Sequence, residues 1–210
     1  MEPRRSGSRR LITTLVAVAL GVIALAAPAS ATAEPSTAQL SAAIDRVWHE
    51  RATDADRALL ARVPEVAKRV VDPAKTTVQF ERGSGNRPTG ELGTQTAQDE
   101  YNWAYVRVNY YSTLGFTVYS YRQYVEWYYN YNVVTAWKNR YDIVDYNDGT
   151  ANFGAYLQNF ANPPGGTVTS SVMQRQVHHC LATYGCPGWS YPYTQINVFS
   201  NGNATYSSYV

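Results

Sequence analysis

The sequence predicts a mostly β protein: an antiparallel β-sandwich or barrel, with an N-terminal helical segment after a signal peptide. Three observations predict this fold. All 18 tyrosines lie after residue 100, and tyrosine favours strands. Apolar and polar side chains alternate along several runs of this tyrosine-rich half, which is the two-residue period of a strand. Turn-forming residues separate the runs. We therefore expect the β domain to span residues 101–210.

The alternating runs are expected to form about six to eight strands. Their apolar positions are Val106, Val108 and Tyr110; Phe116 and Val118; Val125, Trp127, Tyr129, Tyr131 and Val133; Tyr141 and Ile143; Phe153, Ala155 and Leu157; and Thr194, Ile196 and Val198. Turns are predicted at Leu114-Gly115, Asn147-Asp148-Gly149, Pro163 to Gly166 and Asn201-Gly202. The segment from Val168 to Leu181 fits a helix as well as a strand, and we expect a strand.

Residues 1–33 are typical of a cleavable signal peptide. Four arginines stand in the first ten residues, an apolar run follows from Leu11 to Ala27, and small residues surround Ala31 and Ala33. A basic start, an apolar centre and an Ala-x-Ala end are the three parts of a secretory signal. An uncleaved membrane anchor is the alternative, because the run approaches the roughly 17 residues that a span requires. We expect cleavage and a secreted, extracellular protein.

Residues 34–72 are expected to form a helical segment, and residues 73–100 a polar linker. Apolar side chains recur at helical spacing around Leu40 and again around Leu59, so one or two helices are predicted. Pro64 predicts a kink or a boundary between them. The linker is rich in Gly, Thr, Gln and Asn and has few apolar residues, although Thr76 to Phe80 fits one short strand.

The charge balance argues against nucleic acid as a partner. The chain has 18 basic and 16 acidic residues. Removing the four arginines and Glu2 of the signal segment leaves a net charge of −1. Nucleic-acid binding relies on surplus Lys and Arg to neutralise phosphates, and docking on anionic membranes relies on the same surplus. We therefore expect no nucleic-acid partner, and a membrane partner is not favoured.

The two cysteines, Cys180 and Cys186, are expected to form a disulfide bond. An even number of cysteines in an exported chain favours a cross-link. The alternative is a reactive or metal-binding thiol beside His178 and His179. These two histidines are adjacent, so on one strand they point to opposite faces and cannot both hold one metal there. No metal site and no cofactor are expected.

The sequence contains no catalytic motif that identifies an enzyme. A serine hydrolase would need His178 or His179 as its base, together with a serine nucleophile and a carboxylate. The candidates for these roles are Ser170, Ser171, Ser190, Asp142, Asp145 and Asp148. Glu126 with Asp142 or Asp145 is a conceivable carboxylate pair for glycoside hydrolysis. The residues Asp145 to Gly149 are rich in oxygen ligands, but they are also typical of a turn. No catalytic residue is predicted.

The aromatic density is the feature that points to a binding function. A two-layer fold has one inner face per sheet, so some of these rings should meet solvent or a ligand. The residues predicted to bind are Tyr119, Tyr121, Trp127, Tyr128, Tyr129 and Tyr131. We expect a secreted, non-enzymatic binding protein or adaptor that recognises another secreted protein or a cell-surface glycan. An extracellular hydrolase using His178 or His179 is one alternative, and a membrane-acting toxin is another.

Overall fold

A computed structural model describes residues 34–85 and 100–209 of the chain. The predicted signal peptide and half of the predicted linker, residues 86–99, lie outside the described residues. The helices are α1 (Thr37–Trp48), α2 (Asp54–Ala61), α3 (Pro64–Ala67) and the short 3₁₀ helix η1 (Pro73–Lys75). Three α-helices therefore occupy the segment in which one or two were predicted. Pro64 begins α3 rather than kinking a longer helix, because proline is tolerated in the first helical turn.

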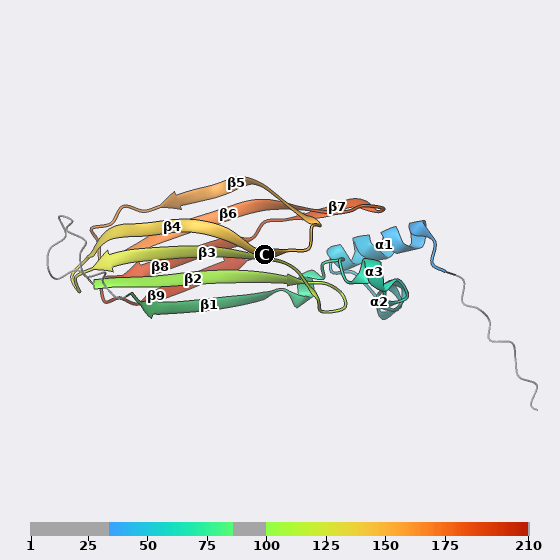
Figure 1. The fold of residues 1–210 in the computed structure, drawn as a ribbon, viewed down its shortest axis with the longest axis horizontal. Coiled ribbons are helices and arrows are strands. Elements are labelled where there is room, and N and C mark those ends of the chain that lie inside the picture. The colour runs from blue at the N-terminus through green and yellow to red at the C-terminus, as the bar shows by residue number, and fades with distance from the viewer. Residues whose placement is uncertain (1–33, 86–99, 210) are drawn as a thin grey trace, which may run out of the picture. The chain divides into compact units, whose positions relative to one another are not determined.

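Two antiparallel sheets follow the helices, and they form the two layers visible in Figure 1. The first sheet has the order β1 (Thr77–Ser84), β2 (Glu100–Tyr111), β3 (Thr117–Tyr129) and β4 (Val134–Asn147). The second sheet has the order β5 (Ala151–Ala161), β6 (Val168–Leu181), β8 (Tyr193–Phe199) and β9 (Ala204–Tyr209), and β7 (Gly185–Ser190) pairs with β6. The predicted sandwich-like, mostly β fold is confirmed. Residues 168–181 form a strand, and β1 lies within the predicted linker.

The turn at Asn147-Asp148-Gly149 differs from its predicted role. Residues of this kind suggest a tight hairpin, but β4 belongs to the first sheet and β5 to the second. The chain therefore passes from one layer to the other here. Gly149 has a φ of +93°, a backbone conformation that a residue with a Cβ rarely adopts. Asp148 accepts hydrogen bonds from the backbone N–H and the hydroxyl of Thr150, which closes the turn.

The apolar core lies between the two sheets. Val106, Val125 and Trp127 of the first sheet pack with Ile196 and Val198 of the second, and all five are fully buried. A second cluster near the β2–β3 turn contains Val108, Val118, Tyr119, Tyr121 and Val177. These positions have the alternation expected of strands with one buried face. The side chains between them must therefore point away from the core.

The helices pack around a separate apolar cluster that also includes Leu181 of β6. Ser36 caps α1 and Thr53 caps α2, each in a reciprocal capping box. The carboxylate of Asp56 also accepts two hydrogen bonds from Arg46, at 2.5 and 3.0 Å. Val71 forms a bridge to Ser112 beyond the end of β2. The packing of Leu181 and the Val71–Ser112 bridge attach the helical segment to the β domain.

Candidate functional site

Five of the six residues predicted to bind are buried. Tyr119, Tyr121 and Trp127 have no exposed surface, and Tyr128 and Tyr129 are 8% and 4% exposed. Only Tyr131, in the turn after β3, is well exposed, at 61%. The physical reason for this correction is the two-residue period of β3: the side chains of Tyr119, Tyr121, Trp127 and Tyr129 point between the sheets. The predicted set therefore does not form an exposed stacking surface.

The opposite face of the first sheet has its own row of aromatic rings, which we call the outer aromatic face. It consists of Tyr101, Trp103 and Tyr105 of β2, Tyr124 and Tyr128 of β3, and Tyr141 of β4. These residues alternate with core residues such as Ala104, Val106 and Val125. Tyr128 is the one predicted residue that belongs to this face, and like Tyr105 it is only 8% exposed. Tyr101, Trp103, Tyr105, Tyr124 and Tyr141 were missed. The alternation of the buried residues Val106 and Val108 could have placed Trp103 on the opposite face.

The rings of the outer aromatic face form a series of four across three strands and a separate pair beside it. The centroid of the Trp103 ring lies 6.1 Å from that of Tyr105 and 6.4 Å from that of Tyr124. The plane of the indole is within 14° of parallel to both tyrosine rings. Tyr124 stacks on Tyr141 at 5.0 Å. Tyr101 and Tyr128 form a tilted pair at 5.8 Å. The edge at Tyr141 is the most open to solvent, because this side chain is 43% exposed.

Cationic side chains lie over these rings. The Lys138 ammonium is 4.0 Å from the centroid of the Tyr101 ring. Arg107 and Arg122 both lie over Tyr105, at 5.3 and 5.2 Å. Asp145 accepts from both arginines at 2.7 Å, so one carboxylate holds the two guanidinium groups in place. Charged and aromatic groups therefore alternate on one sheet surface.

Glu126 lies among these rings and accepts three hydrogen bonds. Their donors are the hydroxyls of Tyr101 and Tyr124 and the side-chain amide of Asn139. Burial alone would raise the pKa of Glu126, but the hydrogen bonds outweigh burial, and the pKa lies below its ordinary value. The carboxylate is therefore charged at neutral pH and fixes the orientation of two rings. Such a surface can stack on apolar ring faces and exchange hydrogen bonds with hydroxyl groups.

A second cluster surrounds His179 on β6. Its Nε2 lies 3.2 Å from Oγ of Ser190, and the Tyr119 hydroxyl lies 2.7 Å from the same Oγ. Of the candidate serines, Ser190 is the one that the described structure places against His179. Burial, assisted by the neighbouring His178, lowers the pKa of His179 to about 3. The imidazole is therefore neutral at neutral pH, and it is a weak base.

No carboxylate orients this histidine among the described residues. Its Nδ1 is buried without a hydrogen-bond partner. The candidate orienting residues lie elsewhere, since Asp145 is on the outer aromatic face and Asp148 closes the turn before β5. A serine–histidine pair is thus present, but the third member of a catalytic triad is not observed.

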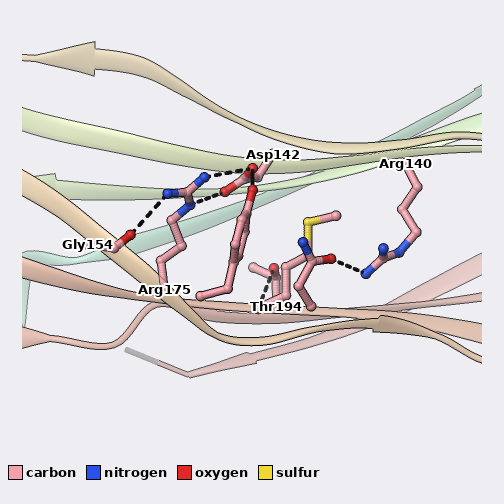
Figure 2. Close-up of polar contacts among 8 residues, drawn as sticks. Arg140, Asp142, Gly154, Arg175 and Thr194 are labelled. Carbon is pink, nitrogen blue, oxygen red and sulfur yellow. Dashed lines mark hydrogen bonds and ion pairs between the residues drawn. The ribbon is translucent and has the colours of Figure 1, made fainter.

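Asp142 takes part in a polar contact between the sheets. Figure 2 shows Arg175 reaching from β6 to this carboxylate of β4, with an Nε–Oδ2 distance of 2.5 Å. Tyr156 also donates its hydroxyl to Asp142, and Arg175 donates to the carbonyl of Gly154. Asp142 points inward and Glu126 outward, so the structure does not bring these two carboxylates together as a glycosidase pair.

Cys180 and Cys186 form the predicted disulfide bond. In the described part of the chain, the one group of possible metal ligands consists of His178 and these two cysteines. Because both sulfurs are joined to each other, they are not free to ligate a metal. Ser170 and Ser171 bond instead to neighbouring side chains, since Ser171 accepts from Gln123 and Arg140, and Ser170 accepts from Asn162.

Comparison of the chain with protein families, curated proteins and solved structures finds no match. Among the residues that the structure describes, no helix has the length and apolar character needed to cross a membrane.

Proposed function

We propose that this chain is a secreted, non-enzymatic binding module that holds a glycan on its outer aromatic face. The observation that carries the proposal is the series of four rings and the neighbouring pair on one sheet surface, interleaved with charged and amide groups. Sugar rings offer apolar C–H faces for stacking and hydroxyls for hydrogen bonding. The disulfide is compatible with an extracellular location, where such bonds persist.

A glycan fits this surface better than a protein partner does. The centres of protein interfaces are depleted of Glu, Asp and Lys. Glu126 lies instead between the two groups of rings, where Tyr101 and Tyr124 orient it. Arg107 and Arg122 lie at the Tyr105 end of the series and are oriented by Asp145. Groups held in this way can exchange hydrogen bonds with hydroxyls without an additional ordering cost. A hydroxyl-rich ligand can stack on the rings of this surface and can also hydrogen-bond to its charged groups.

The experiment is a glycan-binding screen followed by titration of the best ligand. Trp103→Ala and Tyr141→Ala should each weaken binding about tenfold or more, because each removes one stacking ring. Phe116→Ala is the matched control: Phe116 is 59% exposed but lies in the β2–β3 turn, away from this face. Circular dichroism checks that all three variants fold. Equal affinity of the two face variants and the wild type would overturn the proposal, and so would a partner that proves to be a protein.

A serine hydrolase is the second candidate, because Ser190 and His179 lie within hydrogen-bonding distance. A fluorophosphonate probe that labels activated serines tests it. Labelling that is lost in Ser190→Ala would support this candidate. Absence of labelling would remove it and leave the binding proposal intact, because the two sites share no residue.

A further inference from the structure

A cavity of about 210 Å³ lies where the end of α1 meets β2 and β7. Four of its lining residues are aromatic: Trp48, Tyr110, Trp189 and Tyr191. Glu50 also lines it, as does Ser190. A liquid water molecule occupies about 30 Å³, so the cavity has room for a ligand of several heavy atoms. It lies apart from the outer aromatic face, since the two share no residue.

Three of the four rings are held from behind by another ring. Trp48 packs on His179 at 4.5 Å, and Tyr110 stacks on Tyr119 at 4.1 Å. Trp189 stacks on His178 at 3.7 Å, with planes only 6° apart. The aromatic walls are therefore fixed before any ligand arrives. This also gives both histidines a role that does not require proton transfer.

The charge at the cavity is negative. Glu50 is its one charged lining residue. Of the nearest cations along the chain, Arg51 pairs with Asp45, and Lys75 directs its ammonium to the carbonyl of Thr113. Glu50 has a φ of +55° because it follows the last turn of α1: its N–H donates to the carbonyl of Val47, and the N–H of Arg51 donates to that of Arg46. Aromatic walls beside one carboxylate favour a cation.

One hydroxyl at the cavity has no hydrogen-bond partner. Thr76 Oγ1 is buried and unpaired, whereas Tyr110 Oη lies beside the hydroxyls of Tyr119 and Ser190, and both residues line the cavity. Tyr110 as a whole is 2% exposed. A buried polar group without a partner costs about 1–3 kcal/mol. A ligand that brings a hydroxyl of its own would relieve that cost.

We propose that this cavity binds a small quaternary ammonium alcohol of the choline type. The methylated nitrogen has no N–H donor, so it is recognised by ring faces and by the Glu50 carboxylate rather than by hydrogen bonds. The alcohol supplies the partner for Thr76 Oγ1. This site goes beyond the glycan-binding function proposed above, and neither depends on the other.

The first test compares choline with 3,3-dimethyl-1-butanol, which has the same shape and hydroxyl but carries no charge. Calorimetry or quenching of tryptophan fluorescence measures both affinities on the full secreted chain. Choline should bind at least tenfold more tightly, because only the cation gains from the rings and the carboxylate. Equal affinities, or no binding of choline at millimolar concentration, would overturn the proposal.

Variants then test each wall separately. Trp189→Ala should weaken choline binding about tenfold and Glu50→Gln about threefold or more. Phe116→Ala and Glu65→Gln are matched controls at exposed positions outside this cavity, and they should leave choline affinity unchanged. Glu50 is exposed, so Glu50→Gln keeps the proposal testable if Trp189→Ala fails to fold. Unchanged affinity in Glu50→Gln would remove the carboxylate from the site and contradict the proposal.

The hydroxyl contact is tested by comparing choline with tetramethylammonium, which has no hydroxyl. Thr76→Val should weaken choline about threefold or more and leave tetramethylammonium unaffected, because only choline has a hydroxyl to lose. An equal effect on both ligands would contradict this pose. Trp103→Ala, which tests the glycan face, should not change choline binding. Failure of one site is therefore distinguishable from failure of the other.

Discussion

The indole of Trp48 lies against Gly188, in the space that any side chain at position 188 would occupy. A Cβ added there would overlap the indole nitrogen and its neighbouring carbons. Trp48 ends α1 and Gly188 lies within β7, so this contact joins the helical segment to the second sheet. The same indole forms one wall of the choline-type cavity. Glycine is therefore required at this position by close approach rather than by backbone conformation.

Gly188→Ala should displace Trp48 and destabilise the protein by about 1–3 kcal/mol, the usual cost of overpacking. Urea unfolding measures this loss. Gly154→Ala is the matched control, because the nearest atom to its added Cβ would be a backbone oxygen at 3.3 Å, and we expect a much smaller change. Equal losses in the two variants would show that the displacement of Trp48 adds no cost beyond that of the control.

The buried His179 should make stability depend on pH. Its pKa is lowered from 6.5 to about 3 in the folded chain. Below pH 6.5 the unfolded chain therefore takes up a proton that the folded chain does not accept. The stabilising contribution is complete above pH 6.5 and is lost as the pH falls towards 3. The slope approaches about 1.4 kcal/mol per pH unit in that window.

Urea unfolding between about pH 5 and 6 isolates this effect, because ordinary carboxyl groups titrate lower. His179→Gln should flatten the slope in that window. His49→Gln is the control, since His49 is an exposed residue at the end of α1, and it should leave the slope as in the wild type. An unchanged slope in His179→Gln would assign the pH dependence to other groups.

The strand pattern was predictable because alternation is a local property. Val106, Val125 and Ile196 mark buried faces directly in the sequence, and the structure places them in one core. The same alternation did not show which face of β3 would be covered. Tyrosine suits a buried face as well as a half-exposed one, so Trp127 and Tyr129 were assigned to a ligand surface when they belong to the core.

The contacts between distant elements were not predictable in this way. Trp48 and Gly188 are far apart in the sequence, and nothing in either segment indicates that they meet. Ser190 was one of three candidate serines, and only the pairing of β6 with β7 brings it to His179. Asp142 and Arg175 likewise meet because β4 and β6 face each other. Such contacts depend on the topology of the sheets rather than on a local pattern.

Removing the disulfide should destabilise the chain by about 2 kcal/mol. The cross-link closes a short loop, with a sequence separation of 6, and short loops give values at the low end of the usual range. The double variant Cys180→Ser/Cys186→Ser can be compared with the wild type by thermal unfolding. A reducing agent should lower the midpoint of the wild type to that of the variant and leave the variant unchanged. A further fall in the reduced variant would indicate an effect unrelated to this bond.

Asp142→Asn should destabilise the fold through the contact that Figure 2 shows with Arg175. The two side chains are 7% and 23% exposed, so losing the carboxylate charge leaves a largely covered guanidinium without its counter-ion. Removing one charge from a fully buried ion pair costs about 3–5 kcal/mol of stability. Partial solvent access reduces this, and we expect about 2 kcal/mol in urea unfolding.

The surface pair of Glu65 and Lys68 is the matched comparison, because the Glu65 side chain is 79% exposed. Glu65→Gln should cost less than about 1 kcal/mol, as exposed ion pairs usually do. A double variant that combines Asp142→Asn with Arg175→Met should lose less than the sum of the two single changes, because each removes the same interaction. Strict additivity would mean that the two side chains stabilise the sheets independently. The packing of β4 on β6 would then depend on the neighbouring contacts, such as Arg140 with the carbonyl of Val172 at 3.0 Å.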